Sequence, residues 1–154
     1  KAKNTIVRRE KHHQYSAVLK LCFAPSENGE QAGLTCYYST NNYLKCCLIY
    51  EDRLKVKVIE NRNGVQKTLG EKNVKEGPIY VKAVINKQTR NFYYSYEEKH
   101  WHHVGGTEDA TFLSDEGARD EKGHTGTMVG MYANNGGSNR GIPADFDWFR
   151  YTAF

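Results

Sequence analysis

Hydrophobic and polar residues alternate with a period of two along most of the chain. The clearest hydrophobic series are Ala17, Leu19, Leu21 and Phe23; Leu54, Val56 and Val58; and Ile79, Val81, Ala83 and Ile85. Successive side chains of a strand point to opposite faces, so this alternation indicates strands with one face in a core and the other in water. No window has a convincing helical stripe, and the polar segment Asp109–Lys122 is predicted to be a loop or a single turn.

Turn-forming residues separate the hydrophobic runs at regular intervals. Pro25–Gly29 follows the first long run, Thr40–Asn42 links two aromatic runs, and Asn63-Gly64 is typical of a two-residue hairpin turn. Asn86–Thr89 joins two further runs, and Asn134–Asn139 is predicted to be a long loop before the last strand. The spacing predicts nine or ten strands in an all-β, two-sheet antiparallel sandwich, with residues 1–154 as a single domain.

Charge and composition narrow the range of partners. The chain has 22 Lys and Arg against 18 Asp and Glu, a net charge of +4, and its lysines are spread along the sequence. Nucleic-acid binders more often concentrate such residues in one stripe, so we expect no nucleic-acid partner. No run approaches the roughly 18 apolar residues that span a bilayer, and no signal peptide is visible, so we expect no membrane partner. The chain begins at Lys1 without a methionine, which we interpret as a fragment of a longer protein, either bacterial cytoplasmic or secreted.

Cysteines, histidines and carboxylates offer little catalytic chemistry. Three of the four cysteines lie in apolar runs, and no C-x-x-C spacing occurs, so buried free thiols are expected rather than a zinc site. His100 and His102 would share one face of a strand, but no third metal ligand is identifiable. Asp145 and Asp147 would also share a face. We interpret them as one structural carboxylate beside a solvated one, the alternative being the carboxylate pair that a glycosidase requires.

Aromatic residues are more numerous than a core of this size requires. The surplus set consists of Tyr37, Tyr38, Tyr43, Tyr50, Tyr93, Tyr94, Tyr96 and Trp101. The flat C–H faces of sugar rings pack on aromatic rings, so the set as a whole is compatible with a carbohydrate surface. For any single tyrosine in the set, packing in the core or across strands is the alternative.

Several sequence strings, in order and spacing, carry a family resemblance. They are Thr5–His13, Tyr15–Leu21, Glu30–Tyr38, Asn42–Leu44, Phe92–Ser95, Trp101, Ala110–Ser114, Glu116-Gly117 and Pro143–Tyr151. Together they resemble the C-terminal concanavalin A-like β-sandwich of glycoside hydrolase family 43 β-xylosidases and α-arabinofuranosidases, from about Thr5 to Tyr151.

The resemblance implies a jelly-roll sandwich appended to a five-bladed propeller that holds the catalytic carboxylates. The chain contains no part of such a propeller, so the resemblance implies a domain that is not itself an enzyme. In some members a loop of the sandwich lends an aromatic residue to the rim of the active site, just before a Gln-Ala-Gly-Leu string. This chain has Asn28-Gly29-Glu30 at that place. Related modules bind xylan in their own right.

These observations lead to two hypotheses of different kinds. The first is a module that binds xylan or arabinoxylan, with Tyr37, Tyr43, Tyr94 and Trp101 stacking on sugar rings and with Asn41, Asn42 and Arg90 as polar partners. The alternative is a structural domain that supports the catalytic domain of the same enzyme without binding sugar alone. No cofactor is required. A structural Ca²⁺ is predicted at Asp147 or Asp145, with Glu10 if the first and last strands are neighbours.

Overall fold

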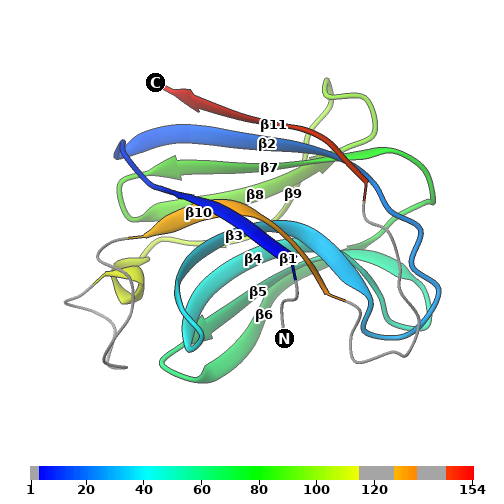
Figure 1. Cartoon of the computed structure of the whole chain (residues 1–154), viewed down its shortest axis with the longest axis horizontal. Coiled ribbons are helices and arrows are strands. Elements are labelled where there is room, and N and C mark those ends of the chain that lie inside the picture. Colours follow the sequence, from blue (N-terminus) through cyan, green and yellow to red (C-terminus); the bar gives the residue numbers. More distant parts are fainter. Residues whose placement is uncertain (1–3, 115–126, 135–144) are drawn as a thin grey trace.

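Two antiparallel sheets face each other in the computed structural model, which describes residues 4–114, 127–134 and 145–154, with the backbone alone for 4–6 and 145–148 (Figure 1). The first sheet has, in spatial order, β1 (Asn4–Arg9), β10 (Met128–Asn134), β3 (Gln31–Ser39), β4 (Asn42–Tyr50), β5 (Leu54–Arg62) and β6 (Val65–Asn73). The second has β11 (Asp145–Ala153), β2 (Gln14–Cys22), β7 (Ile79–Asn86), β8 (Thr89–Ser95) and β9 (His102–Thr107). The predicted all-β sandwich is confirmed.

The core lies between the sheets and is built from the alternating positions that the sequence indicated. In β2 and β7 every predicted inward residue is buried, and Val56 and Val58 of β5 are buried as well. The turn at Asn63-Gly64 is confirmed as a two-residue hairpin turn between β5 and β6, since both residues have positive φ angles, 52° and 89°. Hydrophobic alternation therefore located both the strands and the faces that they bury.

The two sheets meet at the edge formed by β6 and β9. A Cβ atom on Gly70 of β6 would lie 1.8 Å from the backbone oxygen of Val104 in β9, so the approach requires glycine. A register shift between Val58 and Ile59 leaves Leu69 as an extra residue in β6, and Leu69 packs against the core. This bulge and the glycine together hold one edge of the sandwich closed.

Three features of the fold differ from the sequence prediction or extend it. The structure describes eleven strands rather than nine or ten. Within Asp109–Lys122, which was predicted to be a loop or a single turn, Thr111–Leu113 form a 3-10 turn. Residues 115–122 and most of the predicted loop Asn134–Asn139 lie outside the described residues. Among the described residues, no helix is long and apolar enough to cross a membrane.

Candidate functional site

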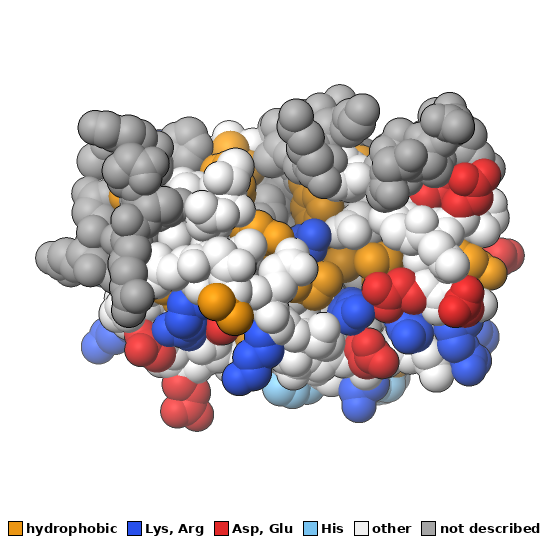
Figure 2. All heavy atoms as spheres, turned by 90° about the horizontal axis from the view of Figure 1, so that it is seen from below, with side chains coloured by type: hydrophobic (Ala, Val, Ile, Leu, Met, Phe, Trp, Pro, Cys, Tyr) orange, Lys and Arg blue, Asp and Glu red, His pale blue; other side chains and the backbone are white. Residues whose placement is uncertain are grey.

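The side of the first sheet that faces away from the core carries the polar and aromatic side chains that form a candidate ligand-binding surface. Alternate residues of β3 and β4, such as Leu34 and Leu44, belong to the core, so the residues between them face away from it. We call this surface the tyrosine face and define it by Gln31, Thr35, Tyr37, Tyr43, Lys45, Cys47, Ile49, Lys55, Lys57, Ile59, Gln66, Glu71 and Tyr132. Seen from below Figure 1, hydrophobic side chains reach the surface in the middle of the molecule, and charged side chains lie along the lower part of the view, from left to right (Figure 2).

Two tyrosines lie side by side on this face. Tyr37 of β3 is directly opposite Tyr43 of β4 in the strand register, and both are half-buried. Side chains of such cross-strand pairs are in contact range. The amide of Gln66 donates to the Tyr43 hydroxyl at 2.8 Å, and the Lys45 ammonium lies 5.5 Å from the centre of the Tyr43 ring. The pair thus presents two adjacent rings bordered by an amide and a cation.

A small apolar cluster lies beside the tyrosine pair, beneath a fixed polar layer. Cys47, Ile49 and Tyr132 are buried, although they point away from the main core. Burial raises the pKa of the Cys47 thiol and raises that of the Tyr132 hydroxyl well above its ordinary value, so both groups stay protonated at neutral pH. This part of the face is a buried, uncharged floor.

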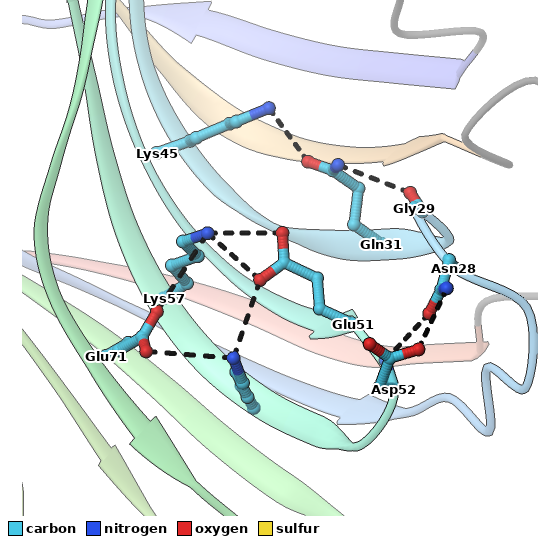
Figure 3. Close-up of polar contacts among 9 residues, drawn as sticks. Asn28, Gly29, Gln31, Lys45, Glu51, Asp52, Lys57 and Glu71 are labelled. Carbon is cyan, nitrogen blue, oxygen red and sulfur yellow. Dashed lines mark hydrogen bonds and ion pairs between the residues drawn. The ribbon is translucent and has the colours of Figure 1, made fainter.

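Gln31 organises the polar layer above that floor (Figure 3). Its Oε1 accepts hydrogen bonds from the Lys45 ammonium at 2.8 Å and from the Tyr132 hydroxyl at 2.7 Å. Its Nε2 donates to the carbonyl of Gly29 at 3.3 Å. Because all three contacts act on one side chain, Lys45 is held next to the tyrosine rings rather than moving freely in solvent.

Four alternating charges occupy the end of the face nearest the β4–β5 turn. The Lys57 ammonium lies 3.0 Å from Glu51 and 3.9 Å from Glu71, and the Lys55 ammonium lies 3.8 Å and 3.7 Å from the same two carboxylates (Figure 3). Such partly exposed pairs contribute at most about 1 kcal/mol each. Each carboxylate lies between two lysine ammonium groups, whereas the two carboxyl groups of a glycosidase flank the scissile glycosidic bond.

The loop between β2 and β3 is fixed by a buried carboxylate at the position where the resemblance implies a rim aromatic. The side chain of Glu30 is 0% exposed, and its Oε1 accepts hydrogen bonds from the backbone N–H groups of Ser26 at 2.9 Å and Glu27 at 3.0 Å. Asn28 and Asp52 join this loop to the β4–β5 turn through contacts of 2.7 and 3.1 Å (Figure 3). Glu30 therefore turns into the domain and shapes the loop instead of projecting from it.

Two of the residues predicted to contact sugar, Tyr94 and Asn42, are buried within the domain. Tyr94 lies in the core on the inward face of β8, with its ring 4.9 Å from that of His102. Burial, with a smaller contribution from Tyr96, raises the pKa of its hydroxyl. Asn42 is buried and exchanges hydrogen bonds with Asn63, at 2.9 and 3.3 Å. Asn41 is exposed in the β3–β4 turn. Of these residues, the structure leaves only Asn41 on the surface.

Trp101 lies on the opposite side of the molecule from the tyrosine pair. It precedes β9 in the second sheet, is half-buried, and has the ammonium of Lys82 4.2 Å from its ring centre. Lys82 is on the outward face of β7, because its neighbours Val81 and Ala83 are in the core. Of the predicted stacking residues, the structure therefore brings together Tyr37 and Tyr43 but not Tyr94 or Trp101.

Arg90 and Glu10 form a buried ion pair between the sheets. Arg90 is 3% exposed, and its guanidinium donates to the two carboxylate oxygens of Glu10 at 2.7 and 3.2 Å. The Tyr15 hydroxyl also donates to Glu10, and Cys36 lies 3.7 Å from the guanidinium. The prediction that Arg90 contacts sugar is therefore corrected: its charge is buried and paired.

The predicted calcium site does not fit Glu10. Both oxygens of its carboxylate face the guanidinium of Arg90, whose positive charge would repel a second cation. The premise that the first and last strands are neighbours is also wrong, because β1 pairs with β10 and β11 pairs with β2 in the other sheet. The side chains of Asp145 and Asp147 lie outside the described residues. In the part of the chain that the structure describes, no group of three His, Cys, Asp or Glu residues could hold a metal ion.

Sequence reasoning missed the residues that border the tyrosine pair. Lys45 follows Tyr43 by two positions, so the period of two could have placed both on one face. Gln31, Gln66 and Tyr132 lie far from Tyr43 in the sequence, and only the strand register brings them near it. Local patterns carry no signal for such contacts.

Comparisons with known proteins agree with one another. The model of the family described as "Beta xylosidase C-terminal Concanavalin A-like domain" matches residues 1–152. The chain is 28% identical to a β-xylosidase of Bacillus subtilis, with 95% of this chain and 28% of that protein covered. It is 30% identical to the non-reducing end α-L-arabinofuranosidase BoGH43B of Bacteroides ovatus, with 95% and 27% covered.

Solved structures that match the chain are also those of GH43 proteins and xylosidases. The crystal structure of the GH43 protein BlXynB from Bacillus licheniformis matches with a TM-score of 0.96 and 74% identity, covering 99% of this chain and 30% of that one. A xylan β-1,4-xylosidase from Bacillus halodurans matches with a TM-score of 0.86 and 29% identity, covering 96% and 29%. The chain therefore spans less than a third of the length of each of these relatives.

Proposed function

The chain belongs to the family of C-terminal concanavalin A-like domains of GH43 β-xylosidases, and from this premise we propose that it is the non-catalytic accessory module of a xylan-degrading enzyme. In this proposal the tyrosine face binds xylan or arabinoxylan chains. The catalytic domain of the same enzyme is its second partner.

The observation that carries the binding proposal is the adjacent pair Tyr37 and Tyr43 on an outward sheet face. Two neighbouring rings offer a surface for the C–H faces of sugar units. Lys45 and Gln66, which border the pair, can donate hydrogen bonds to sugar hydroxyls. Their positions are set by Gln31 and by the Tyr43 hydroxyl, so little side-chain entropy is lost when a ligand binds.

The expected affinity is low. An open sheet face buries little of a sugar chain, and the sugar hydroxyls must give up their water. We expect a dissociation constant on the order of 0.1–1 mM for a xylo-oligosaccharide long enough to cover both rings. An accessory module gains from weak binding, because its covalent link to the catalytic domain raises the effective concentration of both on one polymer.

The alternative is a domain that supports the catalytic propeller without binding sugar by itself. It predicts a broad, flat and exposed apolar patch on one sheet. Among the described residues, the exposed large hydrophobic side chains are those of Val65, in β6 of the first sheet, and Phe154, which follows β11 of the second. This distribution favours the binding proposal over support alone.

Isothermal titration of the chain with xylohexaose tests the binding proposal. Tyr43→Ala should weaken binding about ten-fold, because it removes one stacking ring and the hydrogen-bond acceptor of Gln66. Tyr80→Ala is a matched control, since Tyr80 is a half-buried tyrosine on the outward face of β7, beside Lys20. Equal losses in the two variants, or no heat from the unaltered chain at millimolar ligand, would refute the proposal.

A further inference from the structure

An open pocket of about 490 Å³ lies at the end of the sandwich where the β1–β2 connection meets the β7–β8 turn and the residue that follows β11. We call it the His-Lys pocket. Its lining residues are Lys11, His12, His13, Gln14, Lys87 and Phe154. Its volume falls within the range of ordinary small-molecule sites.

Hydrogen bonds between the three segments fix the walls of the pocket. The backbone N–H of Lys87 donates to the carbonyl of His13 at 2.6 Å, and the N–H of Phe154 donates to the carbonyl of Gln14 at 3.1 Å. The Gln14 side chain donates to that of Asn86 at 3.0 Å. Backbone bonds thus hold the pocket in shape before any ligand arrives.

Two lysines, Lys11 and Lys87, give the pocket its positive charge. Among the described residues, no Asp or Glu side chain forms an ion pair with either lysine. His12 is oriented by a contact of 3.0 Å between its Nδ1 and the Tyr151 hydroxyl, which leaves Nε2 on the other side of the ring. Like charges gathered around one depression repel one another, and a bound anion would relieve that repulsion.

The ligand chemistry follows from the mixture of groups. Lys11 and Lys87 supply positive charge, and Gln14 and the histidines supply neutral hydrogen-bonding groups. Phe154 is 63% exposed and adds an apolar ring surface at the same place. Cations, amides and an aromatic ring together match a sugar that carries a carboxylate better than they match a bare inorganic anion.

We propose that the His-Lys pocket binds the carboxylate of an acidic sugar, the class to which uronic acid substituents of acidic xylans belong. The xylan context rests on the proposed function, whereas the anion site itself does not. None of the residues that line the pocket belongs to the tyrosine face, so we expect the pocket to contact a substituent of the polymer rather than the main-chain units that lie on the tyrosine rings.

Titration of the chain with sodium glucuronate, glucose and inorganic phosphate at matched low ionic strength tests this proposal. Glucuronate should bind up to about five-fold more tightly than glucose, because one exposed ion pair contributes at most about that factor. The double variant Lys11→Gln/Lys87→Gln should abolish the preference. The matched control Lys99→Gln removes an exposed lysine between β8 and β9, away from the pocket, and should leave the preference unchanged.

Each other outcome overturns the assignment. Equal binding of glucuronate and glucose would exclude an anion site, and tighter binding of phosphate than of glucuronate would exclude a sugar-acid site. Failure of the pocket proposal can be distinguished from failure of the proposed function, because neutral xylohexaose tests only the tyrosine face. Glucuronate binding without xylohexaose binding would retain the pocket and remove the xylan proposal.

Discussion

Replacing Glu10 with glutamine is expected to destabilise the domain by about 3–5 kcal/mol, the cost of breaking a buried ion pair from one side. Glu10 follows β1 in the first sheet and Arg90 belongs to β8 in the second, so their pair joins the two sheets. Glu10→Gln keeps the size of the side chain but removes the charge that neutralises the guanidinium.

The magnitude follows from the burial of Arg90. Its guanidinium is almost fully buried, and its Nε has no hydrogen-bond partner among the described residues. Burial acts to lower the pKa of Arg90, whereas Cys36 and then the hydrogen bond and charge of Glu10 act to raise it. The ordinary pKa of a guanidinium is so high that the arginine stays charged even when the carboxylate is lost. Tyr15, which donates to the same carboxylate, then keeps only a neutral acceptor.

Urea unfolding followed by circular dichroism measures the effect. With a slope of roughly 1–3 kcal/mol per M urea, the midpoint should fall by about 2 M. Glu71→Gln is the matched control, because its carboxylate is 47% exposed and its ion pairs contribute less than about 1 kcal/mol. The double variant Glu10→Met/Arg90→Met should cost much less than the sum of the single variants. A loss below about 1 kcal/mol for Glu10→Gln, or additive losses in the double variant, would refute this reasoning.

Three further predictions concern the thiols and the glycine edge. Burial raises the pKa of the Cys36 thiol to about 11, and it also raises the pKa values of the Cys46 and Cys47 thiols. A thiol reagent at pH 8 should therefore modify only the half-buried Cys22 in the folded domain. Rapid modification of a second thiol would contradict the structure. The unfolded thiol has a pKa near 8.5, so the folded domain retains protons that the unfolded chain loses. The contribution of these protonated thiols to the free energy of unfolding should be fully present below about pH 8.5. It should decrease toward pH 11 by about 1.4 kcal/mol per pH unit for each such thiol. A urea midpoint that stays constant between about pH 8 and 10.5 would exclude this effect. Gly70→Ala should destabilise the domain by at least about 1–3 kcal/mol in urea unfolding, because its Cβ would overlap the backbone of β9, whereas Val65→Ala at an exposed position should change stability by less than about 0.5 kcal/mol.

The period of two carried most of the information on fold that the sequence holds. It located the buried faces of β2, β5 and β7. It could also have excluded two of the predicted sugar contacts, those of Arg90 and Tyr94. Arg90, Phe92 and Tyr94 alternate along β8, so a buried phenylalanine between them places all three inward. The sequence thus contained a sign that Arg90 and Tyr94 face the core, although an inward arginine requires a partner that alternation cannot identify.

Contacts between distant segments could not be predicted from local patterns. Glu10 and Arg90 are 80 positions apart, and they meet because of the order of strands in two sheets. The same order separates β1 from β11, which removes the reason to combine Glu10 with Asp145 or Asp147. Glutamate is usually a surface residue, yet the loop before Glu30 brings the backbone N–H groups of Ser26 and Glu27 to its carboxylate. Tertiary topology decides each of these cases.

Chemical-shift mapping by NMR with neutral xylohexaose tests most directly whether the tyrosine face is the sugar-binding surface. The account predicts that the amide signals of Tyr37, Tyr43 and Lys45 move progressively with ligand, with dissociation constants on the order of 0.1–1 mM. Signals around Trp101, on the opposite sheet, should not move. Shifts confined to Trp101 and its neighbours, or no shifts at millimolar ligand, would contradict it.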